Sequence, residues 1–177
     1  WKRYIPGFVH VDLCDMPHID YQHRVDSLPM FEDGSAELIY GSHVLEYLDR
    51  EEAHTALAEW HRVLKRGGLL RMAVPDFPAL VRVYEKSGDL DNILGPLYGR
   101  MVVECGGRQE TVVYHRTVYD FPSLKRLLED AGFTDVRRYD WRNTVHKDYD
   151  DHSQAYFPHM DKEHGLLVSL NVEATKG

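Results

Sequence analysis

The sequence has little cysteine, no long hydrophobic stretch and no excess of basic residues. Its 177 residues include only two cysteines, Cys14 and Cys105, which are too few and too far apart to predict a disulfide framework. No apolar run approaches the roughly 20 residues that span a bilayer, and no signal-peptide pattern opens the chain. These features predict a protein of the reducing cytoplasm that has no membrane partner.

The charge balance argues against a nucleic-acid partner. The formal net charge is −8, and the basic pairs Lys65-Arg66 and Arg137-Arg138 are scattered along the chain. Binding to a phosphate backbone depends on clustered Lys and Arg. The hydrophobic content of 43% and the charged content of 28% are ordinary for a globular protein. The length predicts a single domain over residues 1–177.

Histidine is frequent, with eleven residues in the chain. His152, His159 and His164 share the polar stretch 143–165 with several aspartates. Their spacings match no zinc pattern, and carboxylates and imidazoles in a polar loop are usually solvated. No metal site is expected.

The middle of the chain has the pattern of a strand, a helix and a second strand joined by short connections. Residues 36–41 form the short apolar run of a buried strand. Asp49 is a suitable N-cap, and apolar positions recur at helical spacing from 53 to 64. Residues 69–74 predict the next strand. In such a βαβ unit the two strands are parallel.

Further elements extend this pattern in both directions. Strands are predicted at 8–12 and, very short, at 23–26. A helix is predicted to begin near Pro122, because its first turn tolerates proline. Strands are predicted at 136–141 and 166–174. The sequence therefore predicts an open α/β sheet.

Small or acidic residues follow the strands that are predicted to be parallel. Asp12, Asp26 and Asp76 each stand at a strand end, and Gly41-Ser42-His43 ends the strand between the last two of these. Open α/β sheets bind ligands at the carboxyl ends of their parallel strands. These positions are therefore predicted to line a ligand crevice.

Four stretches of the sequence follow one another in the order known from one enzyme family. They are "IPGFVHVDL" (5–13), "DSLPMFEDGSAELIYGSHVLEYL" (26–48), "EWHRVLKRGGLLRMAVPD" (59–76) and "SLKRLLEDAGFTDV" (123–136). Together they cover most of the chain and resemble the class I S-adenosylmethionine-dependent methyltransferases, most closely the small predicted methyltransferases. The resemblance implies a Rossmann-like open sheet, mostly parallel with a C-terminal antiparallel hairpin, and S-adenosylmethionine as the cofactor.

The resemblance implies that two acids bind the nucleoside part of the cofactor. Asp12 resembles the acid that accepts hydrogen bonds from the ribose hydroxyls, and Asp26 with the backbone of Ser27 and Leu28 resembles the group that recognises adenine. Both have simpler readings. Asp12 could cap a turn at its strand end, and a dinucleotide-binding protein would also carry an acid there. Asp26 could form an Asx turn before Leu28.

The same resemblance places Gly41 and Ser42 beside the methionyl part of the cofactor, and His43 near the reacting methyl group or the acceptor. Methyl transfer needs alignment and exclusion of water. It needs a base only if the acceptor is a hydroxyl or a protonated amine. His43 and Asp76 are the candidate catalytic residues, with His115 a weaker one. His43 could instead be a packed or turn-forming histidine.

The acceptor is expected to be a small molecule contacted by the less regular region 75–119 and by the loop 143–165. Nothing in the sequence identifies this acceptor or predicts the oligomeric state. The alternative function is a methyltransferase-like binding domain without catalysis.

The family's first strand and glycine-rich loop have no counterpart in the sequence. That strand lies centrally in the family, between the strands that here end at Asp12 and Tyr40. Buried backbone groups nearly always find partners. We therefore expect the native polypeptide to extend upstream of Trp1 by a short strand and a glycine-containing loop, and we expect these two strands not to pair directly.

Overall fold

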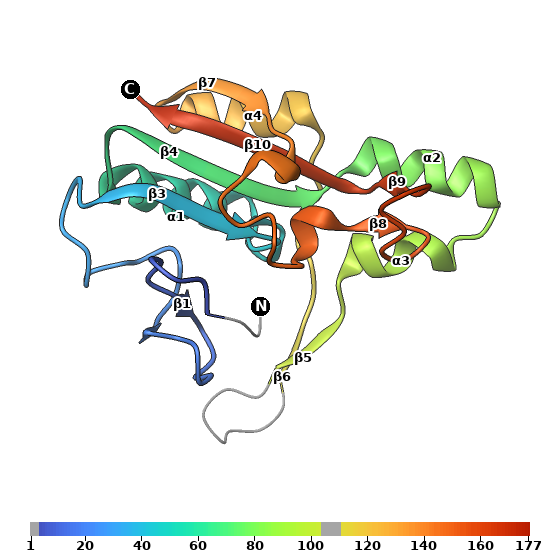
Figure 1. The fold of residues 1–177 in the computed structure, drawn as a ribbon, viewed down its shortest axis with the longest axis horizontal. Coiled ribbons are helices and arrows are strands. Elements are labelled where there is room, and N and C mark those ends of the chain that lie inside the picture. Colours follow the sequence, from blue (N-terminus) through green and yellow to red (C-terminus); the bar gives the residue numbers. More distant parts are fainter. Residues whose placement is uncertain (1–3, 104–110) are drawn as a thin grey trace.

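A computed structural model describes residues 4–103 and 111–177, and its centre is a four-stranded mixed sheet in the order β3-β4-β10-β7 (Figure 1). β3 and β4 are parallel, and β10 is antiparallel to both of its neighbours. The predicted open α/β sheet and its C-terminal antiparallel hairpin are confirmed, although this sheet is less parallel than expected. The strands are β3 (Ala36–Ser42), β4 (Leu64–Pro75), β7 (Phe133–Arg138) and β10 (Ser169–Lys176).

Two helices, α1 (Arg50–Val63) and α4 (Phe121–Asp130), cover one face of this sheet (Figure 1). The predicted cap of α1 is present, because the Asp49 carboxylate accepts from the amides of Glu51 and Glu52. Apolar side chains of α1 and α4 form the main core with alternate residues of the strands. Buried members include Leu57, Trp60, Leu70, Met72, Leu124, Leu128, Leu170 and Val172.

Several element boundaries differ from the sequence prediction. β4 begins at Leu64 instead of residue 69, because Leu64 is fully buried and already pairs with Ala36 of β3. The strand predicted at 136–141 runs from Phe133 to Arg138. The final strand is divided at Val168 into β9 (Leu166–Leu167) and β10.

A second, smaller core lies beyond the carboxyl end of β4 (Figure 1). Helices α2 (Phe77–Ser87) and α3 (Asp91–Tyr98) pack there with the β8-β9 pair, in which β8 is Tyr156–Phe157. The sequence did not predict these helices, since α3 contains an internal proline and both are short. β5 (Met101–Val103) and β6 (Thr111–Val113) pair after α3, and residues 104–110 of the predicted acceptor region lie outside the described residues.

The other face of the sheet is polar and is covered by the segment 139–165. The Tyr40 hydroxyl donates to Asp151 Oδ2 at 2.6 Å, and the Asn171 amide donates to the Ser153 carbonyl at 2.8 Å. Residues along a strand alternate between faces, so the same strands supply apolar side chains to the helices and polar ones to this segment. Its short 3-10 helices are η2 (Trp141–Asn143) and η3 (His152–Gln154).

The N-terminal residues form a separate pair of parallel strands, β1 (Val11–Asp12) and β2 (Tyr21–Gln22). The strand predicted at 23–26 is absent, and Arg24 begins a turn there instead. Among the described residues β1 does not pair with β3, which is the arrangement expected from the sequence. The unit is joined to α1, where Trp60 Nε1 donates to the Val25 carbonyl at 2.7 Å.

None of the described helices is long and apolar enough to cross a membrane. Cys14 is disulfide-bonded, although the two distant cysteines of the sequence predicted no disulfide framework.

Candidate active site

The carboxyl ends of β3 and β4 bring four of the predicted site residues to one edge of the sheet. Ser42 pairs with Ala73 of β4, and the His43 amide donates to the Ala73 carbonyl at 2.8 Å. Gly41, Ser42 and His43 therefore lie beside the strand that leads into Asp76. The Ser42 hydroxyl is buried and has no hydrogen-bond partner among residues 4–103 and 111–177.

The imidazole of His43 is held between two elements that are distant in sequence. Its Nδ1 lies 3.1 Å from Glu46 Oε1, and its Nε2 lies 3.2 Å from Ser169 Oγ on β10. The ring also meets that of His152 edge-on, with centroids 5.0 Å apart. His43 has a φ of 54°, a left-handed conformation that is uncommon outside glycine and concentrates at functional sites.

Glu46 was not predicted from the sequence as a site residue, and it is fully buried in the 3-10 helix η1 (Leu45–Tyr47). Besides its contact with His43, its Oε1 lies 3.9 Å from Nε2 of His115. Burial raises the pKa of Tyr119 to about 12, and the Glu46 carboxylate adds to this effect. A charged residue inside the apolar run "HVLEYL" was the available signal.

His115 packs under α3 and is also mostly buried. Its Nδ1 lies 3.0 Å from the Pro96 carbonyl, which can only accept, so this nitrogen carries a proton. Burial lowers the pKa of His115, and the nearby Glu46 opposes this shift. A Cβ at Gly99 would lie 2.0 Å from His115 Nε2, so the position of this ring depends on glycine there.

Asp76 lies at the N-cap position of α2, but its side chain does not cap the helix. The residue is buried, with 6% of its surface exposed. Its Oδ2 is 3.6 Å from Arg138 Nη1, and within the described part of the chain its Oδ1 has no hydrogen-bond partner. Asp76 therefore has one carboxylate oxygen able to accept a proton.

The predicted nucleoside-binding residues lie apart from this edge, in the N-terminal unit. Asp12 ends β1, and its Oδ1 accepts from the Cys14 amide at 2.9 Å, as a turn-capping acid would. Asp26 binds Arg24 through two contacts of 2.9 and 2.5 Å, and the hydrogen bond from Arg24 lowers the pKa of Asp26.

Leu28, which follows Ser27, is attached to α1 through its backbone. Its amide donates to Glu59 Oε1 at 2.6 Å, and its carbonyl accepts from Arg62 Nη2 at 3.0 Å. Leu28 also accepts from the Phe31 amide at 3.1 Å, and among the described residues no hydrogen bond or ion pair joins Asp26 or Leu28 to the edge formed by β3 and β4. Their adenine role stays a prediction.

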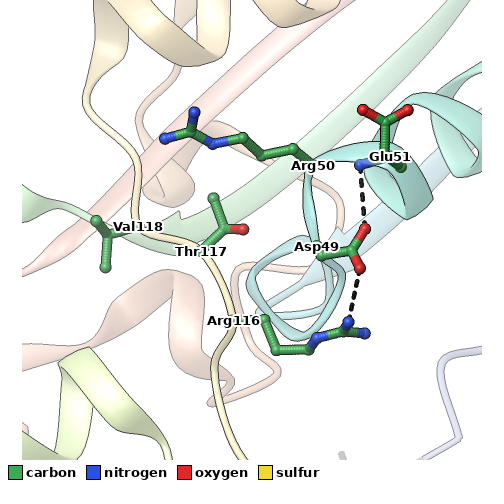
Figure 2. Close-up of a pocket in the computed structure, with 6 residues that line it drawn as sticks. All are labelled: Asp49, Arg50, Glu51, Arg116, Thr117 and Val118. Carbon is green, nitrogen blue, oxygen red and sulfur yellow. Dashed lines mark hydrogen bonds and ion pairs between the residues drawn. The ribbon is translucent and has the colours of Figure 1, made fainter.

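Two of the surface depressions lie along α1. One of about 490 Å³ lies at the start of α1, where the Arg116 guanidinium binds Asp49 Oδ2 at 2.6 Å (Figure 2). The Asp49 carboxylate there accepts from the amides of Glu51 and Glu52, and Arg50 also lines the depression. The other, of about 530 Å³, follows the outer side of α1 and includes Asp26. Within the described ranges no cluster of three His, Cys, Asp or Glu is arranged to hold a metal ion.

Comparison with known proteins relates this arrangement to methyltransferases. Residues 8–72, which include Asp12 and Gly41–His43, match the family described as "Methyltransferase domain". No curated protein matches the sequence.

Solved structures share the fold at low sequence identity. A SAM-dependent methyltransferase of Thermotoga maritima, titled a possible histamine N-methyltransferase, has 20% identity and a TM-score of 0.53, with 90% of this chain and 65% of that chain covered. A SAM-dependent methyltransferase of Methanosarcina mazei has 17% identity and a TM-score of 0.52, with 89% and 67% covered.

A Burkholderia thailandensis N1-methyltransferase, whose title names bound 1,6-didemethyltoxoflavin and S-adenosylhomocysteine, has 15% identity and a TM-score of 0.51. The alignment covers 94% of this chain and 59% of that one. The chain thus spans less than two thirds of the Thermotoga and Burkholderia proteins. Residues 8–72 thus match a methyltransferase family, and the chain shares the fold of SAM-dependent methyltransferases.

Proposed function

We propose that this protein transfers the methyl group of S-adenosylmethionine to a small-molecule acceptor. The observation that carries the proposal is the family match over residues 8–72, which includes Gly41–His43 at the end of the strand that pairs with the one leading to Asp76. No observation on the described residues favours the non-catalytic alternative. The predicted cytoplasmic location stays a prediction.

The residues at the β3 edge suit the methionyl part of the cofactor. The buried Ser42 hydroxyl has no partner among the described residues, and an amino-acid group would supply one. A Cβ at Gly41 would meet no atom closer than 4.0 Å, which leaves space beside the backbone. Asp12 would bind the ribose. Asp26 and the backbone of Ser27 and Leu28 would face adenine, and the hydrogen bond from the Leu28 amide to Glu59 Oε1 would hold this segment against α1.

When bound, the cofactor supplies an electrophilic methyl group on a sulfonium. The chain aligns the acceptor and excludes water, and the small core of α2, α3 and β8-β9 lies beyond the strand ends where a cover is needed. Asp76 Oδ1 would take up the acceptor proton, and His43 would contact the acceptor.

A calorimetric titration of the native polypeptide with S-adenosylmethionine tests the proposal. Saturable binding is expected, followed by methyl transfer from labelled cofactor to at least one member of a panel of small hydroxyl and amine compounds. Absence of cofactor binding by the folded protein would overturn the proposed function.

Asp12→Ala is expected to weaken cofactor binding by about 1–3 kcal/mol, because hydrogen bonds to a charged acceptor are lost. Asp12→Asn separates this effect from turn capping, since its amide oxygen can still accept from the Cys14 amide. The exposed Asp15→Ala serves as the matched control and should bind like the wild type. Unchanged affinity in a folded Asp12→Ala protein would show that Asp12 only caps the turn.

We also propose that the native polypeptide places a strand beside β3, as the sequence led us to expect. Among the described residues β3 pairs only with β4, so its other edge has unpaired backbone groups. Amide hydrogen exchange on the native polypeptide tests this. Protection of consecutive amides along residues 36–42 is expected, whereas protection of alternate amides only would show that the edge is free.

A further inference from the structure

Glu46 is a buried carboxylate for which the described residues provide no hydrogen-bond donor. Its side chain has no exposed surface, and neither carboxylate oxygen has a hydrogen-bond partner among residues 4–103 and 111–177. Two ring nitrogens lie within 4 Å of Oε1, His43 Nδ1 at 3.1 Å and His115 Nε2 at 3.9 Å, but neither meets it in hydrogen-bond geometry. Within the same ranges no Lys or Arg forms an ion pair with Glu46. Leaving a buried carboxylate in this state is costly.

The hydroxyl of Tyr119 is a second buried polar group without a partner in this place. Tyr119 is 5% exposed, and no described residue meets its hydroxyl in hydrogen-bond geometry. The amides of Arg116 and Thr117 donate to the Glu46 carbonyl at 2.7 and 3.2 Å, so the segment that leads to Tyr119 runs beside η1. Burial raises the pKa of Tyr119 to about 12, and the Glu46 carboxylate adds to this effect. The Tyr119 phenol therefore lies near the Glu46 carboxylate.

Asp76 adds a third such group, from the end of β4. Its backbone forms an isolated parallel bridge with Tyr119, and the next amide, of Phe77, donates to the Tyr119 carbonyl at 3.1 Å. Asp76 is itself buried, and in the described part of the chain its Oδ1 has no hydrogen-bond partner. The carboxyl end of β4 thus gathers buried oxygen atoms from η1, from the segment at 116–119 and from Asp76, without matching donors.

This excess of acceptor oxygens decides which kind of ligand suits the site. An ionised carboxylate can only accept hydrogen bonds, and the two carboxylates would both gain from a positive charge beside them. A protonated amine brings several N–H donors on a compact cation, and such charge-assisted hydrogen bonds are the strong ones. A hydroxyl compound brings one donor and no charge. A carboxylate or phosphate compound would add a like charge.

We propose that Glu46 selects the acceptor, and that this acceptor is a small primary or secondary amine, bound as its ammonium ion with N–H groups directed to the Glu46 carboxylate. The inference rests on the proposed function, because it names the class of acceptor for the same site. Asp76 Oδ1, which would take up the acceptor proton, belongs to a different element, so binding and proton removal are assigned to separate carboxylates. Only 12% of the neighbouring His43 side chain is exposed, so a compact head group suits the site.

Nuclear magnetic resonance of the native polypeptide with ¹³C-labelled glutamate tests this proposal, with ethylammonium chloride as the probe. The carboxyl signal of Glu46 is identified by its absence from Glu46→Gln or, if that variant does not fold, from Glu46→Asp. Ethylammonium is expected to shift the Glu46 signal saturably. Ethanol, and tetramethylammonium chloride, which has no N–H group, should not shift it at the same concentration and ionic strength. An unmoved signal, or an equal shift with tetramethylammonium, would overturn the proposal.

Calorimetry with the same probe adds a second readout. Glu46→Gln should bind ethylammonium about tenfold more weakly or worse, because hydrogen bonds to a charged group are lost. The exposed Glu85→Gln on α2 is the matched control and should bind like the wild type. Equal affinity of Glu46→Gln and the wild type would contradict the role of Glu46.

A parallel titration with S-adenosylmethionine separates the two proposals. If the cofactor binds and ethylammonium does not, the acceptor class is wrong and the proposed function stands. If ethylammonium binds at Glu46 and the cofactor does not bind, the proposed function fails and the amine site stands.

Discussion

Trp60→Ala is expected to lower the free energy of unfolding by about 3–5 kcal/mol, the usual cost of truncating a buried aromatic side chain. Trp60 is 4% exposed and packs in the main core between α1 and the sheet. Its indole also donates to the Val25 carbonyl at 2.7 Å, which joins the N-terminal unit to α1. Urea unfolding followed by circular dichroism measures the change.

Trp60→Phe divides this effect into packing and hydrogen bonding. Phenylalanine retains most of the buried surface but leaves the Val25 carbonyl without its donor, which costs about 1–3 kcal/mol if the carbonyl stays buried. His54→Ala, on the exposed side of the same helix, should change stability by less than about 0.5 kcal/mol. A Trp60→Ala protein that unfolds like the wild type would show that α1 does not pack on the sheet in this register.

Acidification is expected to destabilise the fold through His146, which is fully buried and stacked on Tyr40 with ring centroids 3.8 Å apart. Burial lowers the pKa of His146 to about 4, although the nearby Asp151 carboxylate favours the charged form. In the unfolded chain the pKa of histidine is about 6.5. The unfolded state therefore binds more protons between these values, so stability is present above pH 6.5 and is lost as the pH falls toward 4.

The pKa of His146 is about 4 in the folded protein and about 6.5 in the unfolded chain. Each pKa unit corresponds to about 1.4 kcal/mol, so acidification through this range lowers the free energy of unfolding by about 3 kcal/mol. Arg71 and Tyr139 also face the ring, and Arg71 disfavours its protonation. Unfolding free energies measured from pH 7.5 to 4.5 test this prediction against the variant His146→Phe.

Phenylalanine keeps the stack on Tyr40 and removes no hydrogen bond, because neither ring nitrogen of His146 has a partner among the described residues. The His146→Phe protein should therefore lose less stability on acidification than the wild type. If the free energy of unfolding falls equally steeply with decreasing pH in the two proteins, His146 is solvated or already charged in the folded state.

The sequence was sufficient where local pattern and chain order decide the structure. The short apolar run at 36–41 and the helical spacing after Asp49 correctly predicted β3, α1 and their order in a parallel unit. They also placed Gly41–His43 at a strand end beside the strand leading to Asp76. The spacing of apolar residues along a helix or strand shows which of its faces is buried, and this spacing can be read from residues that are close together in the sequence.

Local pattern was insufficient for the elements with weak periodicity. The helices α2 and α3 were not predicted, because they are short and proline interrupts the second. The strand expected at 23–26 was wrong, since Arg24 and Asp26 pair with each other in a turn. An ion pair two residues apart satisfies both side chains locally and does not require a strand.

The sequence by itself determined the α/β sheet and the polar edge at the ends of β3 and β4. Only the tertiary structure decided the state of the side chains at that edge. Glu46 is fully buried beside His43 and His115, and Nε2 of His43 lies 3.2 Å from Oγ of Ser169, which is 126 residues further along the chain. The charge and hydrogen-bond direction of a buried group depend on every element packed around it, and this depends on long-range contacts that no local pattern contains.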